Sequence, residues 1–208
     1  MKKAITQWLV GGLAAYALVS ACAQAQTVDL KGLAATMKQG GYVIVFRHGA
    51  TNRDQADTDP LNHDNVAKQR LLSEGGKEVA KQVGATFKTL GIQIGKTYTS
   101  KFNRAVETGR IISGTEVTPS FDITEGGLVV TPIENDRRAE AFRKMAAMPP
   151  EAGKNTLIVS HKPNIIDAFG KDWFEVKEGE ASIFKPDGYG KAALIARVQA
   201  VDWIKATK

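Results

Sequence analysis

Short apolar, β-branched runs alternate along the chain with longer segments whose apolar residues recur at helical spacing. A buried strand reads as a short apolar run, whereas an amphipathic helix repeats its apolar positions every three to four residues. The runs that predict strands are residues 42–46, 96–99, 156–159, 182–184 and 192–198. The segments that predict helices are residues 29–39, 73–90, 103–113, 135–148 and 164–169. The alternation predicts an α/β fold, a three-layer sandwich with a largely parallel central sheet.

The first 25 residues have the layout of a secretory signal rather than of a folded element. Basic Lys2 and Lys3 precede an apolar run over residues 9–21, which is the order found in signal peptides. Two glycines interrupt this run, and it is shorter than the roughly 20 residues that a membrane-spanning helix needs. We therefore expect export and no membrane span.

Two cleavage signals compete at the end of this segment. Ala23-Gln24-Ala25 is a small-x-small site, which predicts a signal peptide over residues 1–25 and a single domain over residues 26–208. Residues 19–22 instead resemble a lipobox, which would leave a lipid anchor on Cys22. The first site is favoured because valine is a weak match at the leading lipobox position. We expect a periplasmic or secreted protein, with a lipoprotein anchored through Cys22 as the alternative.

Charge and cysteine content narrow the classes of partner. The formal net charge of +6 includes Lys2 and Lys3, so the mature chain keeps only a modest positive surplus. Basic and acidic residues are interspersed and aromatic residues make up 7% of the chain, so we do not expect a nucleic-acid partner. Cys22 is the only cysteine, which leaves the mature chain without a disulfide or a cysteine nucleophile.

Basic side chains follow three of the predicted strands directly. Arg47, His48 and Gly49 follow the first strand, His161 follows the third, and Arg104 begins the helix after the second. In a parallel sheet the carboxyl ends of the strands meet at one edge, where ligands bind. We therefore expect these side chains to form one basic pocket.

Arginine and histidine in this arrangement suit phosphoryl transfer. A transferring phosphoryl group spreads negative charge over three oxygens, which Arg47 and Arg104 would clamp. Their charges would keep His48 unprotonated, and a neutral imidazole is a competent nucleophile. His161 would donate to a phosphate oxygen as negative charge develops. We expect Arg104 to face a solvent-reachable pocket instead of forming a buried ion pair.

The two histidines could instead be zinc ligands, completed by an Asp or a Glu. Two arginines beside the site would repel a divalent cation, and the sequence contains no HxxxH or HExxH helix. We therefore expect neither a metal nor another cofactor.

Four sequence blocks resemble those of the histidine phosphatase superfamily, also called phosphoglycerate mutase-like. Arg47-His48-Gly49 resembles its RHG motif, residues 72–76 its helix start, residues 100–108 its S-x-x-x-R-A-x-x-T segment, and Ser160-His161 its second histidine block. The resemblance implies a phosphoglycerate mutase-like fold, and together with the signal-like residues 1–25 it leads us to expect an exported bacterial member. It also implies His48 as the nucleophile, Arg47 and Arg104 as phosphate ligands, and His161 as the second catalytic histidine.

The resemblance leaves the general acid open. Many members place a Glu after the second block, where this chain has Glu125. Phytase-like members use an Asp directly after the second histidine, but Lys162 stands there. Glu180 is the other possibility, and we favour Glu125. Thr51 aligns with a Ser or Thr that contacts phosphate or forms a turn, and Gly49 keeps the pocket clear of a side chain.

These observations predict an exported phosphatase of the histidine acid phosphatase type, which hydrolyses a small phosphomonoester through a phosphohistidine on His48. One alternative is a phosphomutase of the same fold, which export and the short segment between Glu125 and Thr156 disfavour. The other is a phosphate-binding module without turnover, because a fold does not guarantee activity. His63 lies in a polar loop, and we interpret it as incidental.

Overall fold

The computed structural model describes residues 28–126 and 129–206. The expected signal peptide over residues 1–25 and the alternative anchor at Cys22 lie outside the described residues. The helices are α1 (Leu30–Met37), α2 (Glu74–Leu90), α3 (Asn103–Ser113), α4 (Pro132–Ala146), α5 (Lys162–Phe169) and α6 (Ala200–Lys205). The strands are β1 (Val43–Arg47), β2 (Ile94–Ser100), β3 (Thr118–Ser120), β4 (Asn155–Ser160), β5 (Glu180–Pro186) and β6 (Ala192–Gln199).

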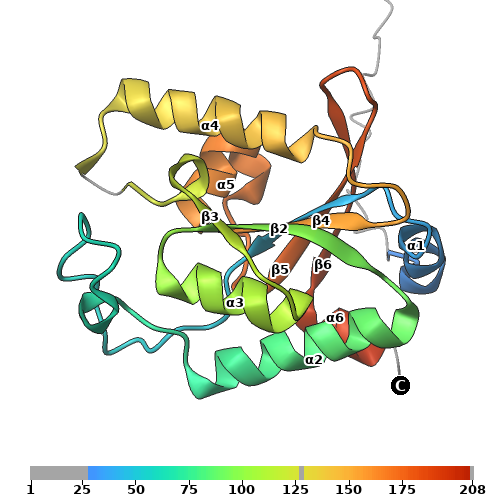
Figure 1. The fold of residues 1–208 in the computed structure, drawn as a ribbon, viewed down its shortest axis with the longest axis horizontal. Coiled ribbons are helices and arrows are strands. Elements are labelled where there is room, and N and C mark those ends of the chain that lie inside the picture. The colour runs from blue at the N-terminus through green and yellow to red at the C-terminus, as the bar shows by residue number, and fades with distance from the viewer. Residues whose placement is uncertain (1–27, 127–128, 207–208) are drawn as a thin grey trace, which may run out of the picture.

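The strands form a sheet in the order β3-β2-β4-β1-β5-β6 (Figure 1). β1 pairs parallel with β4, β4 with β2, and β2 with β3. β5 pairs antiparallel with both β1 and β6. The predicted α/β fold with a mostly parallel sheet is therefore confirmed, with an antiparallel β5–β6 ribbon on one side.

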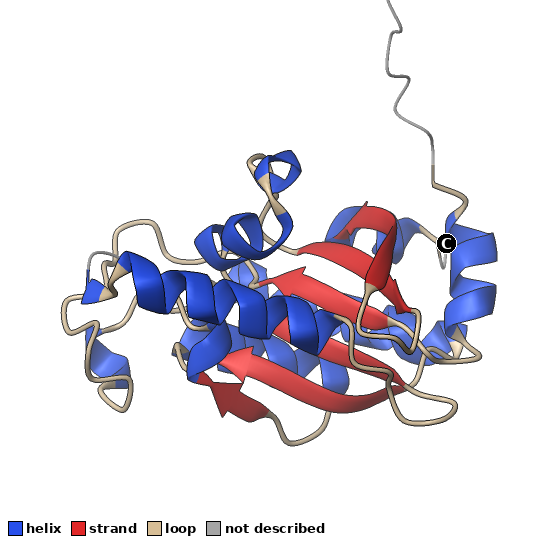
Figure 2. Ribbon diagram, turned by 90° about the horizontal axis from the view of Figure 1, so that it is seen from above, coloured by secondary structure: helices blue, strands red, loops and turns tan. Residues whose placement is uncertain are grey.

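Helices cover both faces of this sheet (Figures 1 and 2). Ile44 and Phe46 of β1 face the core shared with α1, α2, α3 and α6. Val43 and Val45 face the opposite way, toward the core shared with α4 and α5. Burial on both faces explains why β1 reads as an unbroken apolar run rather than as an alternating one.

The structure adds elements that the apolar pattern does not predict. β3 is a three-residue edge strand that contains Pro119, and proline weakens the sequence signal of a strand. α6 follows β6 without a break, so its apolar positions merge with those of the strand. α4 begins at Pro132, three residues before the predicted start, because Thr131 caps it by accepting from the Glu134 N–H.

The start of α2 packs closely against the segment that follows β1. Ser73 caps the helix by accepting from the Gly76 N–H, and its backbone N–H donates to the Ala50 carbonyl. A Cβ at Gly76 would lie 2.1 Å from that carbonyl oxygen, which no side chain can tolerate. Glycine at this position therefore sets how closely the chain after His48 approaches α2.

We predict that Gly76→Ala lowers the free energy of unfolding by about 1–3 kcal/mol, because the added methyl group must displace the Ala50 backbone. The matched control is Gly75→Ala, one residue earlier in the same helix, where the nearest atom would be the Ser73 hydroxyl at 3.9 Å. This control should be neutral or slightly stabilising. Chemical denaturation measures both, and equal stabilities would show that the close approach is not a constraint.

Candidate active site

Parallel pairing brings the two histidines together at the carboxyl ends of neighbouring strands. His48 follows β1 and His161 follows β4, and the His48 N–H donates to the Ser160 carbonyl at 3.1 Å. The two rings lie 5.1 Å apart between centroids, at an interplanar angle of 58°. Their side chains are both buried. The structure thus places His48 and His161 next to each other, with their rings tilted, as the strand-end argument expects.

His48 is held in one tautomer by its own neighbour. Its Nδ1 lies 2.8 Å from the Gly49 carbonyl oxygen, which can only accept, so the proton resides on Nδ1 and the lone pair on Nε2. Burial, together with the charges of Arg104, Arg47 and Arg70, lowers the pKa of His48 to about 3. His48 is therefore neutral at pH 7, with Nε2 available as a nucleophile.

His161 lies between a hydroxyl and a carboxylate. Its Nε2 is 2.7 Å from the Ser100 Oγ, and its Nδ1 is 3.5 Å from Glu125 Oε2. Burial, followed by the charge of Arg104, holds the pKa of His161 well below its usual value. Ser100 ends β2 and also accepts from the Phe102 N–H at 3.1 Å. Ser100 thus orients His161, a role that the motif alone does not reveal.

Arg104 corrects an expectation from the sequence, because it is fully buried and ion-paired. Its Nη1 donates to both oxygens of Asp57, at 3.0 and 3.1 Å, and its Nη2 donates to Glu125 Oε2 at 3.2 Å. The Phe102 ring covers its guanidinium at 4.2 Å. A buried charge requires such partners. Arg104 therefore contributes to the stability of the fold in addition to any role in binding a ligand.

Arg47, Gly49 and Thr51 lie close to His48 in the sequence and make hydrogen bonds near it. Arg47 Nη1 donates to the Val176 carbonyl at 2.7 Å, and its Nη2 lies 3.7 Å from Glu178. The Gly49 N–H donates to the Thr108 hydroxyl at 3.1 Å, and a Cβ on Gly49 would approach the Gly76 carbonyl. The Thr51 hydroxyl donates to Glu178 at 3.4 Å, so in this structure it is turned to a carboxylate.

The two carboxylates proposed as general acid have different surroundings. Glu125 is partly exposed and contacts both Arg104 and His161. Glu180 is buried at the start of β5, where it accepts from Arg197 at 2.6 Å, from Gln199 and from the Lys177 N–H. The structure therefore brings Glu125 to His161, whereas Glu180 belongs to a separate buried polar cluster.

Three further charged residues belong to this region and were not singled out from the sequence. Asp57 binds Arg104, Glu178 contacts Arg47, and the charge of Arg70 lowers the pKa of both histidines. Asp57 and Arg70 lie on the loop over residues 52–71, which has no periodic pattern. Only the block that follows Arg70, at residues 72–76, offers a sequence signal near them.

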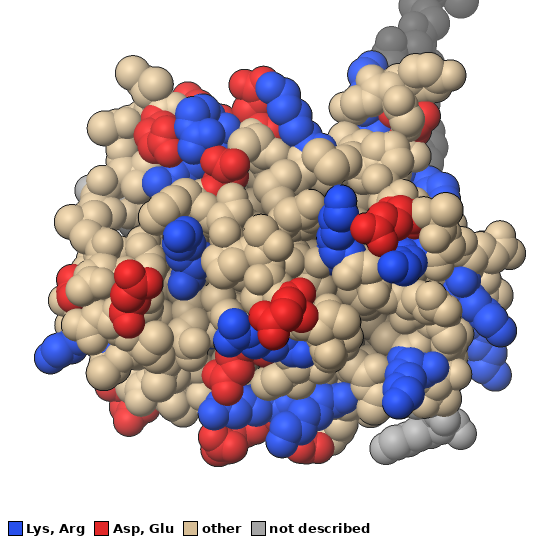
Figure 3. All heavy atoms as spheres, viewed as in Figure 1, with Lys and Arg blue, Asp and Glu red and all other residues tan. Residues whose placement is uncertain are grey.

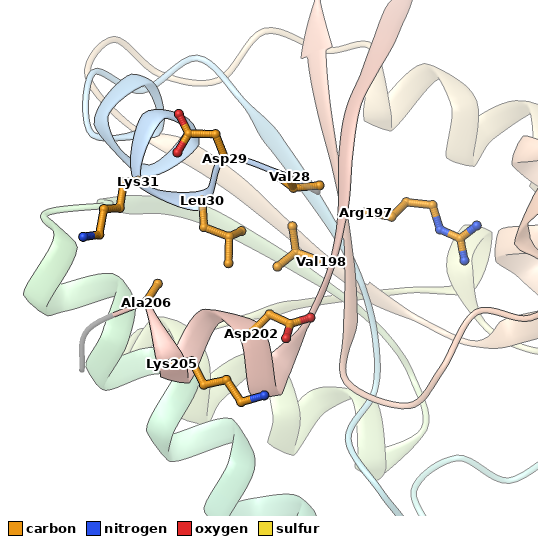
Figure 4. Close-up of a pocket in the computed structure, with 9 residues that line it drawn as sticks. All are labelled: Val28, Asp29, Leu30, Lys31, Arg197, Val198, Asp202, Lys205 and Ala206. Carbon is orange, nitrogen blue, oxygen red and sulfur yellow. The ribbon is translucent and has the colours of Figure 1, made fainter. Parts of the chain in front are cut away.

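Outside the histidine site, the features that could mark another function are charged patches, pockets, metal ligands and membrane-spanning helices. Lys, Arg, Asp and Glu are interspersed over the face that Figure 3 shows. A separate pocket of about 600 Å³ has Leu30 and Val198 in its lining and charges of both signs around them, while Arg197 points away from the others (Figure 4). In residues 28–126 and 129–206 no three His, Cys, Asp or Glu side chains gather as metal ligands would. No helix of that part is long and apolar enough to span a membrane.

The parallel strands bring two neutral histidines and two arginines to one edge of the sheet, an arrangement that suits phosphoryl transfer. The family model of the histidine phosphatase superfamily (branch 1) matches residues 43–128, which include Arg47, His48, Arg104 and Glu125. The match confirms the predicted resemblance to this superfamily over that part of the chain. No curated protein gives a significant match.

Solved structures share the fold at low sequence identity. The protein histidine phosphatase SixA complexed with tungstate is 16% identical, with a TM-score of 0.53 over 77% of this chain and 97% of that one. The alpha-ribazole phosphatase from Shigella flexneri is 16% identical, with a TM-score of 0.55 over 76% and 96%. Phosphoserine phosphatase from Entamoeba histolytica in complex with 3-phosphoglyceric acid is 16% identical, with a TM-score of 0.51 over 77% and 98%.

We predict that stability falls in acid because of the buried histidines. The pKa of His48 is about 3 in the fold against 6.5 for an unperturbed histidine, so below pH 6.5 the unfolded chain binds a proton that the fold excludes. The free energy of unfolding should therefore be constant above pH 6.5 and fall by a few kcal/mol toward pH 3.

Denaturant titrations at pH 7, 5 and 4 measure this slope. His48→Gln should flatten it in part, because His161 still contributes in the same direction. An identical slope in wild type and variant would mean that His48 is not held neutral by the fold.

Proposed function

We propose that this protein is a phosphatase that hydrolyses a small phosphomonoester through a phosphohistidine on His48. The observation that supports this most strongly is a set of buried nitrogens without a hydrogen-bond partner, namely Arg47 Nε, Arg104 Nε and His161 Nδ1. A buried donor without an acceptor costs about 1–3 kcal/mol. Oxygens of a phosphoryl group, placed between these residues, would supply the missing acceptors.

We assign each side chain a role in two steps, and the geometry of the site supports this assignment. In the first, the lone pair on His48 Nε2 attacks phosphorus, the bond from phosphorus to the leaving oxygen breaks, and protonated Glu125 gives its proton to that oxygen. In the second, water attacks phosphorus, the nitrogen–phosphorus bond breaks, and the Glu125 carboxylate accepts the proton of the water. Inorganic phosphate leaves and His48 is again neutral.

The remaining basic residues would stabilise the charge on the phosphoryl oxygens. Arg47 and Arg104 offer their guanidinium groups, and His161 offers a ring nitrogen whose orientation Ser100 fixes. This charge stabilisation by fixed donors is the part of phosphoryl transfer that depends most on the protein. It can proceed without a metal ion, and we propose that the enzyme requires no cofactor.

Two other functions remain as alternatives, a phosphomutase and a binding module without turnover. The structural neighbours with this fold are described as phosphatases of phosphohistidine, phosphoserine or alpha-ribazole phosphate, which supports hydrolysis over transfer. The neutral His48 with a free Nε2 supports turnover over binding alone. Hydrolysis of a phosphomonoester, by the histidine acid phosphatase type of enzyme, is therefore the function that we favour.

We further propose that the enzyme works outside the cytoplasm. The basic start and apolar run of residues 1–25 support a signal peptide, followed by one domain over residues 26–208. A periplasmic or secreted enzyme, or a lipoprotein anchored through Cys22, would then act on phosphomonoesters outside the inner membrane. Fractionation of cells and mass spectrometry of the mature amino terminus would test this location and separate its two forms.

We predict that His48→Ala abolishes turnover of p-nitrophenyl phosphate. It should also abolish the acid-labile, protein-bound phosphate that a rapid quench traps on the wild-type protein. The variant lacks the only nucleophile, so the residual rate should be at least 10³-fold lower. The control is Lys96→Ala, which changes an exposed side chain away from the histidines.

We also predict that activity persists in EDTA. Loss of turnover that zinc or magnesium restores would contradict the proposal that the enzyme needs no metal.

We predict that Glu125→Gln discriminates between leaving groups. Hydrolysis of an alkyl phosphate needs a proton on the leaving oxygen and should slow by on the order of 10²-fold, whereas p-nitrophenyl phosphate should slow only mildly. Glu180→Gln is the matched control, which should lose thermal stability through its Arg197 pair but show no such contrast. If only Glu180→Gln shows the leaving-group dependence, Glu125 is not the acid.

A further inference from the structure

The guanidinium of Arg104 already binds an anion that belongs to the chain itself. Both oxygens of Asp57 accept from its Nη1, at 3.0 and 3.1 Å, while Glu125 accepts from its Nη2. The Phe102 ring covers one face of the guanidinium. In this state only the Nε of Arg104 is without a partner among the described residues. The group that should hold a phosphoryl oxygen is thus largely engaged by carboxylates.

Asp57 reaches Arg104 from a loop that is closed on itself. The Thr58 N–H donates to the Lys68 carbonyl at 2.9 Å, and the Asn52 N–H donates to the Leu71 carbonyl at 3.1 Å. Asp57 Oδ1 accepts the Arg70 N–H at 2.9 Å as well as Arg104. The loop is the cyan-to-teal segment between β1 and α2 in Figure 1. The Asp57 contact is therefore part of the loop's own closure.

Contacts at the far side of the loop are few and belong to side chains. Gln69 accepts the Asn103 N–H at 2.7 Å, which joins the loop to the start of α3. The His63 ring packs edge-on against Phe102 and Phe121, at 4.9 and 5.5 Å between centroids. No strand of the sheet includes any residue of the loop. Segments held by few buried contacts open at low free energy.

A phosphoryl dianion and the Asp57 carboxylate would repel each other if both bound Arg104. Glu125 can avoid this repulsion by carrying the proton that a general acid needs, but Asp57 has no such role in the reaction. We propose that Asp57 occupies the phosphate-binding position of Arg104 in the free enzyme and is displaced, with its loop, when substrate binds. The inference rests on the proposed function and makes Asp57 the residue that sets phosphate affinity.

Two other roles for Asp57 lead to opposite expectations. If Asp57 held Arg104 in its productive orientation, removing the carboxylate would weaken phosphate binding. If Asp57 competed with phosphate, removing its charge would tighten binding. The apparent affinity is the intrinsic affinity multiplied by the fraction of enzyme in which Arg104 is free to bind phosphate. The sign of the change in phosphate affinity therefore decides between them.

Calorimetric titration with inorganic phosphate tests this in wild type, Asp57→Asn and Asp54→Asn at one ionic strength. Asp54 lies on the same loop and is exposed, so its variant removes the same charge without touching Arg104. We expect Asp57→Asn to bind phosphate about tenfold more tightly. This is the change expected if Asp57 leaves Arg104 free in about one in ten molecules of the wild type. Asp54→Asn should stay within about twofold, the size of a screened surface effect.

Amide hydrogen exchange of the wild type gives an independent measurement. The Arg70 N–H should exchange faster when phosphate is saturating, because Asp57 then leaves it, while the Gly76 N–H at the α2 cap should not change. Unchanged or slower exchange at Arg70, or weaker binding by Asp57→Asn, would overturn the inference. Wild type that binds phosphate and turns over p-nitrophenyl phosphate would keep the proposed function even then, whereas wild type that does neither would contradict both.

Discussion

The parallel pairing of β1 with β4 is the constraint on which the rest of the site depends. Its register sets Arg47 opposite Ser160, so the residues that follow in each strand, His48 and His161, emerge side by side. The next parallel pair, β4 with β2, adds Ser100 and the start of α3 in the same way. A shift of one residue would turn each side chain to the other face of the sheet. The histidine pair therefore depends on the apolar pattern that fixes this register.

Burial then determines the protonation state of what the sheet has assembled. Both histidines and Arg104 lie in a region closed to solvent, where charged imidazole is disfavoured by desolvation and by the neighbouring guanidinium groups. The arginines stay charged because carboxylates compensate them, as Asp57 and Glu125 do for Arg104. The same arrangement thus keeps His48 a neutral nucleophile while the guanidinium groups beside it stay charged.

The sequence predicts the parts of the site that lie on the sheet and its helices. Arg47, His48 and His161 follow strands with clear apolar runs, Arg104 follows a weaker one, and each lies where the strand-end argument expects. Asp57, Glu178 and Arg70 were not found, because they lie on irregular segments that no hydrophobic period describes. The burial of Arg104 was also missed, since the carboxylate that makes it tolerable is 47 residues away in sequence. The sequence favours Glu125 over Glu180 only slightly, and their contacts in the structure separate them clearly.

This division between sheet and loops bears on what can vary among proteins with this fold. The positions of the histidines and of Arg104 are fixed by strand register and by the core. Replacing Arg104 would also leave the Asp57 and Glu125 carboxylates without their positive partner. The loop over residues 52–71 contributes Asp57, Arg70 and His63 through a few hydrogen bonds and two aromatic contacts. Changes there alter the charge and shape around the phosphate with little loss of buried apolar area. Affinity and substrate choice should therefore reside in the loop, and the chemistry in the sheet.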